Sequence, residues 1–139
     1  MNAKLWWIFY RHPVYKLGRS DIEAVDCSGL LGLACESLPV RQRSQAYRIY
    51  LGLDGYTNRP VSLRDNEPID LFFWRIPGGL DRPHGINHMG VAVVEQRTGI
   101  FQVMHASSSK RGVVVIPFGG WTEKYLAPDG YRRLTIGDK

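Results

Sequence analysis

The stretch Asp26-Cys27-Ser28-Gly29-Leu30 decides the fold, because it places a cysteine where a helix is expected to begin. Apolar residues recur at helical spacing from Asp26 to about Glu36, and Asp26 is suited to be the N-cap. Unpaired N–H groups and the positive end of the helix dipole lower the pKa of a thiol at such a position. The sequence therefore predicts Cys27 as a nucleophile. The alternative is a structural cysteine in a buried helix.

The other cysteine, Cys35, is expected to be a small buried apolar residue. If both cysteines lie on one helix, their separation of eight positions corresponds to about 12 Å. This separation is too long for a disulfide.

Around this helix, the sequence predicts a second short helix over Gln42–Leu51 and then a series of strands. The expected strands are Ile69–Ile76, Met89–Val94, Ile100–Met104, Gly112–Ile116 and Tyr131–Ile136. A helical first half followed by an antiparallel meander is an α+β layout rather than a series of βαβ units.

Two histidines flank one expected hairpin and are candidates for the base that a cysteine nucleophile needs. His88 opens the strand before the turn, and His105 closes the strand after it. A turn centred between Gln96 and Arg97 opposes residues whose numbers add to 193, as 88 and 105 do. The two Cβ atoms would then lie about 4.5 to 5.5 Å apart. A slip of one residue would separate them onto opposite faces.

A metal site is the rival use of Cys27, His88 and His105, because these ligand types can hold zinc with one open position. No Cys-x-x-Cys or His-Glu-x-x-His spacing is present, so we expect neither a metal nor a cofactor. The remaining histidines, His12 and His84, lie in loop-like sequence beside prolines and are expected to be structural.

The order of these motifs resembles that of the NlpC family of papain-like cell-wall peptidases. The segment around Cys27 is similar to that family's nucleophile motif, His88–Val93 to its base strand, and His105–Ser107 to its third-residue motif. Between them, Pro68–Phe73 is similar to the family's Pro-Gly-Asp-Leu strand. The resemblance extends over about Pro13–Leu134, nearly the whole chain.

The resemblance implies a papain-like α+β fold, with N-terminal helices packed on a central antiparallel sheet, in a single domain over residues 1–139. It implies that Cys27 attacks the substrate, that His88 takes and returns the proton, and that His105 fixes the imidazole tautomer. The main-chain N–H of Cys27 would help to stabilise the oxyanion.

The resemblance also suggests substrate-binding residues. Tyr15 would line the pocket or help to hold the oxyanion. Asp26 and Ser28 would hold the free amine and the D-glutamyl group, besides capping the helix. Ile69 replaces the family's usual glycine, and Val14–Gly18 lacks the usual tryptophan and glycine pair. These departures bear on the substrate pocket and leave the nucleophile and the base intact.

The activity implied is that of a peptidoglycan hydrolase, a cysteine endopeptidase that cleaves the γ-D-glutamyl to meso-diaminopimelate bond of stem peptides through a thioester. Two alternatives stay open. One is an N-acetylmuramoyl-L-alanine amidase, or another amide hydrolase on the same fold. The other is a non-catalytic cell-wall binding module of a phage tail or secretion machine.

Composition and net charge restrict the class of protein and its partners. The chain has 139 residues, of which 44% are hydrophobic and 22% charged, typical of one globular domain. Its net charge of +5 favours polyanions, but no nucleic-acid module is present, and we expect no nucleic-acid partner.

The apolar stretch Leu5–Tyr10 is far shorter than the roughly 20 residues of a membrane span and lacks a signal cleavage site. We therefore expect synthesis in the cytoplasm and delivery to the periplasm or cell wall by a phage particle or secretion machine. A phage tail, secretion-system or immunity partner would fit that route.

Overall fold

The structure is a computed structural model that describes residues 2–34, 46–51, 60–61, 69–77, 85–95, 97–117, 119 and 125–136. The helices described are α1 (Asn2–Tyr10), α2 (Cys27–Ala34) and α3 (Ala46–Tyr50). The strands described are β1 (Val14–Tyr15), β2 (Ala24–Val25), β3 (Pro60–Val61), β4 (Ile69–Trp74), β5 (His88–Val94), β6 (Phe101–Ser107), β7 (Gly112–Pro117) and β8 (Leu126–Ile136). The chain is thus a mixed helical and β fold, as its sequence predicts.

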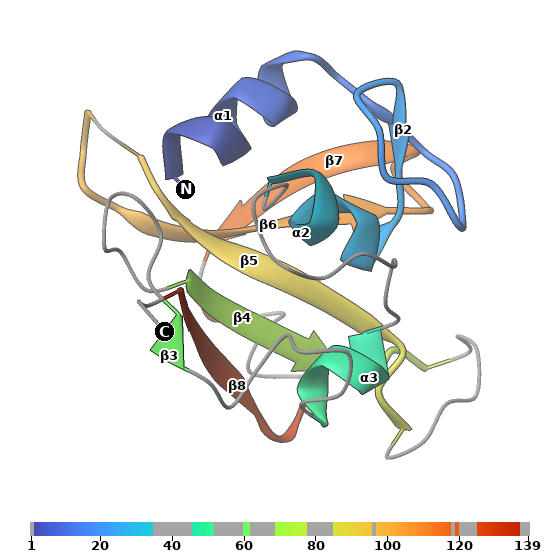
Figure 1. The fold of residues 1–139 in the computed structure, drawn as a ribbon, viewed down its shortest axis with the longest axis vertical. Helices are drawn as coiled ribbons and strands as arrows, with labels where there is room; N and C mark the ends of the chain where they lie inside the picture. The colour runs from blue at the N-terminus through green and yellow to red at the C-terminus, as the bar shows by residue number, and fades with distance from the viewer. Residues whose placement is uncertain are drawn as a thin grey trace.

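The strands form one sheet in the order β2-β1-β7-β6-β5-β4-β8-β3 (Figure 1). At its centre, β4, β5, β6 and β7 pair antiparallel with their neighbours in sequence, which confirms the predicted meander. The last strand, β8, pairs antiparallel with the outer side of β4. The meander therefore brings the strands that carry His88 and His105 next to each other.

Some elements differ from the sequence-based expectation. The strands β1, β2 and β3 have two residues each, too few to show an alternating pattern. The apolar stretch near the N-terminus forms α1. Parts of the two predicted helices, 35–36 and 42–45, lie outside the described residues.

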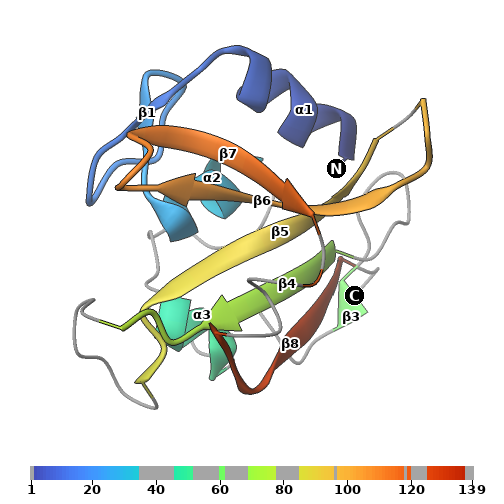
Figure 2. The same ribbon diagram turned by 180° about the vertical axis from the view of Figure 1, so that it is seen from behind.

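The main hydrophobic core lies between the helices and one face of the sheet. In Figures 1 and 2, α2 lies in front of the central strands in one view and behind them in the other. It contacts β5 and β6, and α1 contacts β5. Alternate residues of β5 enter this core, namely Met89, Val91 and Val93.

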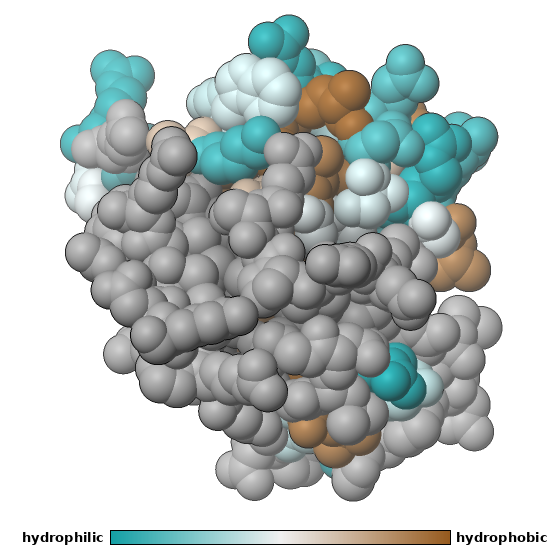
Figure 3. Space-filling view, viewed as in Figure 1, coloured by the Kyte–Doolittle hydropathy of each residue, from teal (hydrophilic) through white to brown (hydrophobic). Residues whose placement is uncertain are grey.

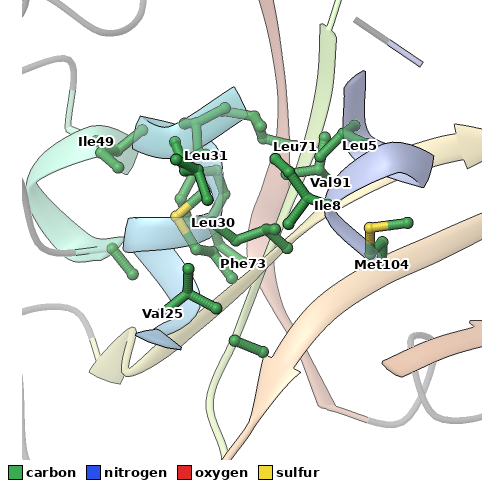
Figure 4. Close-up of a cluster of buried hydrophobic side chains, with 14 of the residues drawn as sticks. Leu5, Ile8, Val25, Leu30, Leu31, Ile49, Leu71, Phe73, Val91 and Met104 are labelled. Atoms are coloured by element: carbon green, nitrogen blue, oxygen red, sulfur yellow. The ribbon is translucent and has the colours of Figure 1, made fainter. Parts of the chain in front are cut away.

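Figure 4 shows how this core is filled. Leu30 and Leu31 of α2 and Leu5 and Ile8 of α1 are fully buried in it together with Phe73 of β4. Burying a leucine, isoleucine or phenylalanine side chain contributes about 1.5–3 kcal/mol, so this packing fixes α2, and with it the start of that helix, against the sheet.

On the surface, Figure 3 shows hydrophilic and hydrophobic residues intermixed over the part of the described chain that includes α1. Among the described residues, no helix is long and apolar enough to cross a bilayer.

Candidate active site

Asp26 caps α2 and ties it to the preceding segment. Its side chain is only 1% exposed, and Oδ1 accepts a hydrogen bond from the N–H of Gly29 at 2.8 Å. Oδ2 accepts another from the N–H of Gly18 at 2.9 Å. A Cβ atom at position 29 would collide with the carbonyl oxygen of Arg19, so glycine is needed for this close approach. The predicted N-cap is confirmed, and it sets Cys27 as the first residue of the helix.

The thiol of Cys27 lies beside the peptide group that joins His88 to Met89. The residue is partly exposed and packs against the core. Burial raises the pKa of the Cys27 thiol, and the N–H groups of Met89, Ser28 and Cys27 itself oppose that rise. The predicted lowering of this pKa is therefore wrong in direction, because desolvation outweighs the N–H groups at the helix start. The contacts that favour the thiolate come from main-chain N–H groups, and no imidazole is among them.

The register of β5 and β6 differs from the prediction by two residues. Val91 lies opposite Met104, so the numbers of opposed residues add to 195 rather than 193. The cause is the turn, in which the N–H of Glu95 bonds to the carbonyl of Ile100 at 3.0 Å. The hairpin centre thus lies one residue later than the sequence suggests.

His88 and His105 consequently meet along a diagonal rather than directly across the strands. A shift of two residues keeps both side chains on one face, because strand side chains alternate with a period of two. Nε2 of His88 lies 2.8 Å from Nδ1 of His105, and the rings meet edge to face with centroids 4.8 Å apart. The predicted pairing of the two imidazoles is therefore confirmed, although the predicted register is not.

Both imidazoles are buried, and burial favours their neutral forms. It lowers the pKa of His88 to about 3, with a further contribution from the neighbouring charge of His105. It lowers the pKa of His105 to about 4, against a main-chain contact at Ala106 that raises it. At neutral pH the site therefore holds a neutral thiol and two neutral imidazoles.

Trp74 is a part of this site that the sequence analysis missed. Its indole stacks on His88 with ring centroids 5.3 Å apart and planes at 24°. The indole and His105 meet edge to face, with ring centroids 5.8 Å apart. A Cβ atom at position 90 would lie 2.9 Å from Cη2 of this indole and 2.8 Å from Cγ1 of Val103. Gly90 thus leaves the space that the indole fills. The available signal was a glycine two residues after His88, on the same face of the strand.

The predicted substrate-binding residues lie close to the start of α2. Oγ of Ser28 is buried and donates to Oδ1 of Asp26 at 3.4 Å. Tyr15 pairs with Val25, two residues before Cys27, and packs against the core. Their roles in binding substrate stay predictions.

Within the described residues, no group of three or more His, Cys, Asp or Glu side chains could hold a metal ion. His12 follows α1 with a φ of 52°, and its N–H bonds to the carbonyl of Phe9 at 3.1 Å. The expectations for Cys35 and His84 lie outside the described residues.

No protein-family model and no curated protein matches this sequence. Solved structures do match. NlpC2 from Trichomonas vaginalis is 19% identical, with a TM-score of 0.62 over 99% of this chain and 46% of that chain. NlpC1 from the same organism is 19% identical, with a TM-score of 0.60 over 98% of this chain and 44% of that one. This chain spans less than half the length of either protein. Its architecture is similar to theirs over nearly all of its residues, and it therefore has an NlpC-like fold.

Proposed function

We propose that this protein is a peptidoglycan hydrolase, a cysteine endopeptidase that cleaves the γ-D-glutamyl to meso-diaminopimelate bond of stem peptides. The observation that carries the proposal is the buried contact of 2.8 Å between His88 and His105, next to the peptide group that the Cys27 thiol touches. The NlpC-like fold also supports it, and we interpret the helices on the meander as a papain-like arrangement.

In the acylation step, the sulfur of Cys27 attacks the γ-carbonyl carbon of the D-glutamyl residue, and the thiol proton moves to Nδ1 of His88. Nε2 of His88 keeps its proton and donates it in a hydrogen bond to Nδ1 of His105. The resulting imidazolium protonates the leaving amine of diaminopimelate, the C–N bond breaks, and a thioester remains on Cys27.

In the deacylation step, His88 removes a proton from water, and the hydroxide oxygen adds to the thioester carbonyl. The C–S bond then breaks, and the proton returns from His88 to the sulfur. The γ-carboxyl group of D-glutamate is released and the neutral pair is restored. No cofactor takes part in either step.

The neutral resting pair fits this sequence of events. Burial disfavours a stored thiolate and imidazolium, so proton transfer accompanies the attack on the substrate. The main-chain N–H of Cys27 would donate to the oxyanion formed in that attack. Tyr15, Asp26 and Ser28 would line the subsite for the free amine and the D-glutamyl group.

Digestion of purified sacculi and of free stem peptides, whose L-alanine amine is not bonded to muramic acid, tests the proposal when the released fragments are identified by mass. We expect wild-type protein to release fragments with a new diaminopimelate amine, and Cys27→Ala to release none. Cys35→Ala is the matched control and should retain the activity. Release of peptides with N-terminal alanine would instead indicate an amidase. No fragments from wild type, or undiminished release by Cys27→Ala, would refute hydrolysis by this cysteine.

A further inference from the structure

We propose that a second site, between α1 and the β5–β6 hairpin, binds an N-acetylated amino sugar of the glycan strand. The site is a pocket of about 640 Å³, within the usual range of small-molecule pockets. It is lined by Ala3, Trp6, Tyr10, Glu95 and Arg97. The identity of the polymer rests on the proposed function, whereas the chemistry of the ligand follows from the lining residues.

Two aromatic rings give the pocket a fixed apolar surface. The rings of Trp6 and Tyr10 lie 6.2 Å apart with their planes at 30°. The indole N–H of Trp6 donates to the carbonyl of Val94 at 3.0 Å and so holds its ring at the end of β5. Tyr10 is 68% exposed. Pyranose rings present C–H groups that pack on such aromatic faces, while their hydroxyl groups stay hydrated at the edges.

The charged residues of the pocket favour a neutral polar ligand. Glu95 and Arg97 have opposite charges, and within the described residues no ion pair joins them. Glu95 offers acceptors and Arg97 offers donors for hydroxyl and acetamido groups. Because the formal charges of Glu95 and Arg97 cancel, the lining has no surplus positive charge that would select a phosphate over a neutral sugar.

A neighbouring aromatic residue of α1 provides a contrast. Trp7 is 45% exposed, but Lys4 and Arg11 lie over its ring at 4.9 and 4.8 Å from the centroid. These cations already occupy the faces that a sugar would use. Trp7 also does not line the pocket. It is therefore the matched control for the rings that do.

The pocket lies far from the candidate catalytic pair. The seven residues from His88 to Val94 separate them along β5, a distance of about 20 Å at roughly 3.3 Å per residue. A stem segment of two residues reaches only about 7 Å. A sugar in the pocket is therefore not joined to the peptide that is cut, and the pocket anchors the polymer.

The test is a titration of a peptide-free oligomer of N-acetylglucosamine into Cys27→Ala protein, followed by tryptophan fluorescence and calorimetry. We expect saturable binding, weakened about tenfold by Tyr10→Ala, which corresponds to about 1.4 kcal/mol. Tyr10→Phe should bind nearly as well as the parent, because it keeps the ring. Trp7→Ala should leave the affinity unchanged. Arg97→Ala, at an exposed residue, provides a second test if Tyr10→Ala fails to fold.

Three results would overturn the site. The first is that no saturable binding occurs at millimolar oligomer. The second is that Tyr10→Ala and Trp7→Ala lower the affinity equally. The third is that the protein is a dimer which Tyr10→Ala converts to a monomer. The last would assign the pocket to a second copy of the chain. Because the probe contains no peptide and the protein no Cys27 thiol, failure of the proposed hydrolysis does not affect this readout. Hydrolysis of sacculi without oligomer binding would refute the pocket alone.

Discussion

Nε2 of His88 lies 2.8 Å from Nδ1 of His105, although the two residues are diagonal rather than opposed in the β5–β6 ladder. Imidazole rings are long enough to meet along such a diagonal. The contact occupies Nε2 of His88, so that Nδ1 is the ring nitrogen left for the proton exchange with Cys27 that we propose. In that proposal Cys27 is the nucleophile, His88 the base and His105 the residue that fixes its tautomer.

The first prediction concerns His105. His105→Ala should lower kcat on stem peptides roughly 10²-fold, because an imidazole misplaced by about 1 Å loses that much. His105→Asn should retain more activity, since its side-chain oxygen can accept from Nε2 of His88 near the position of the lost Nδ1. Steady-state kinetics of both variants beside His88→Ala checks this order. Equal kcat for His105→Ala and wild type would contradict the role.

The second prediction is a loss of stability in acid. The pKa values of about 3 for His88 and about 4 for His105 lie below the ordinary value of 6.5. At pH values between these and 6.5, the folded state therefore binds fewer protons than the unfolded state. Stability is thus fully present above about pH 6.5 and falls as the pH drops towards these values. Each histidine adds a slope of at most about 1.4 kcal/mol per pH unit.

Urea unfolding between pH 3.5 and 7.5 measures this slope. The double variant His88→Gln/His105→Gln should flatten the curve, and His12→Gln, which alters an exposed imidazole, is the matched control. A curve as steep in the double variant as in wild type would show that other groups cause the acid sensitivity.

The third prediction concerns the space beside His88. Gly90→Ala should destabilise the protein by about 1–3 kcal/mol, because the added methyl group would meet Trp74 and Val103 at 2.8 to 3.0 Å. It should also lower kcat, since the displaced indole stacks on His88. Cη2 and Cζ3 of Trp74 have no counterpart in phenylalanine, so adding Trp74→Phe should recover part of the lost stability. Additive losses in this double-mutant cycle would argue against the contact.

The positions of the candidate site residues were predictable because each lies in a segment with a strong local signal. Asp26 and Cys27 precede an apolar stripe, and His88 and His105 flank a hairpin turn. The prediction that both histidines lie on one face of the sheet was correct despite the register error, because a shift of two residues preserves the alternation of side chains along a strand.

The features that could not be predicted depend on contacts between distant segments. The direction in which the pKa of Cys27 shifts depends on how deeply α2 is buried against β5. No local sequence pattern indicates that depth. The stacking of Trp74 depends on the pairing of β4 with β5 and on the missing side chain at Gly90. The two-residue strands β1 to β3 carry too little sequence for a periodic signal.

The fourth prediction concerns the buried cap. Asp26→Ala should lower the free energy of unfolding by about 2 to 4 kcal/mol, because it leaves the N–H groups of Gly18 and Gly29 without their carboxylate acceptors. Asp21→Ala is the matched control. It also loses main-chain contacts, to Glu23 and Ala24, but its carboxylate is solvated and the loss should be smaller. Equal losses in urea unfolding would contradict a structural role for Asp26.

The last prediction concerns the resting state of Cys27. Because burial raises the pKa of its thiol, iodoacetamide should alkylate Cys27 more slowly than a free cysteine at pH 7, and the rate should keep rising above the pH at which free cysteine levels off. The measurement needs a Cys35→Ser background, so that Cys27 is the only thiol that can be alkylated. Fast alkylation at neutral pH that His88→Ala abolishes would instead mean a stored thiolate–imidazolium pair. The raised pKa also makes stability depend on pH. Above the ordinary pKa of a thiol, the unfolded chain has lost the Cys27 proton while the folded state still holds it, so the free energy of unfolding falls as the pH rises.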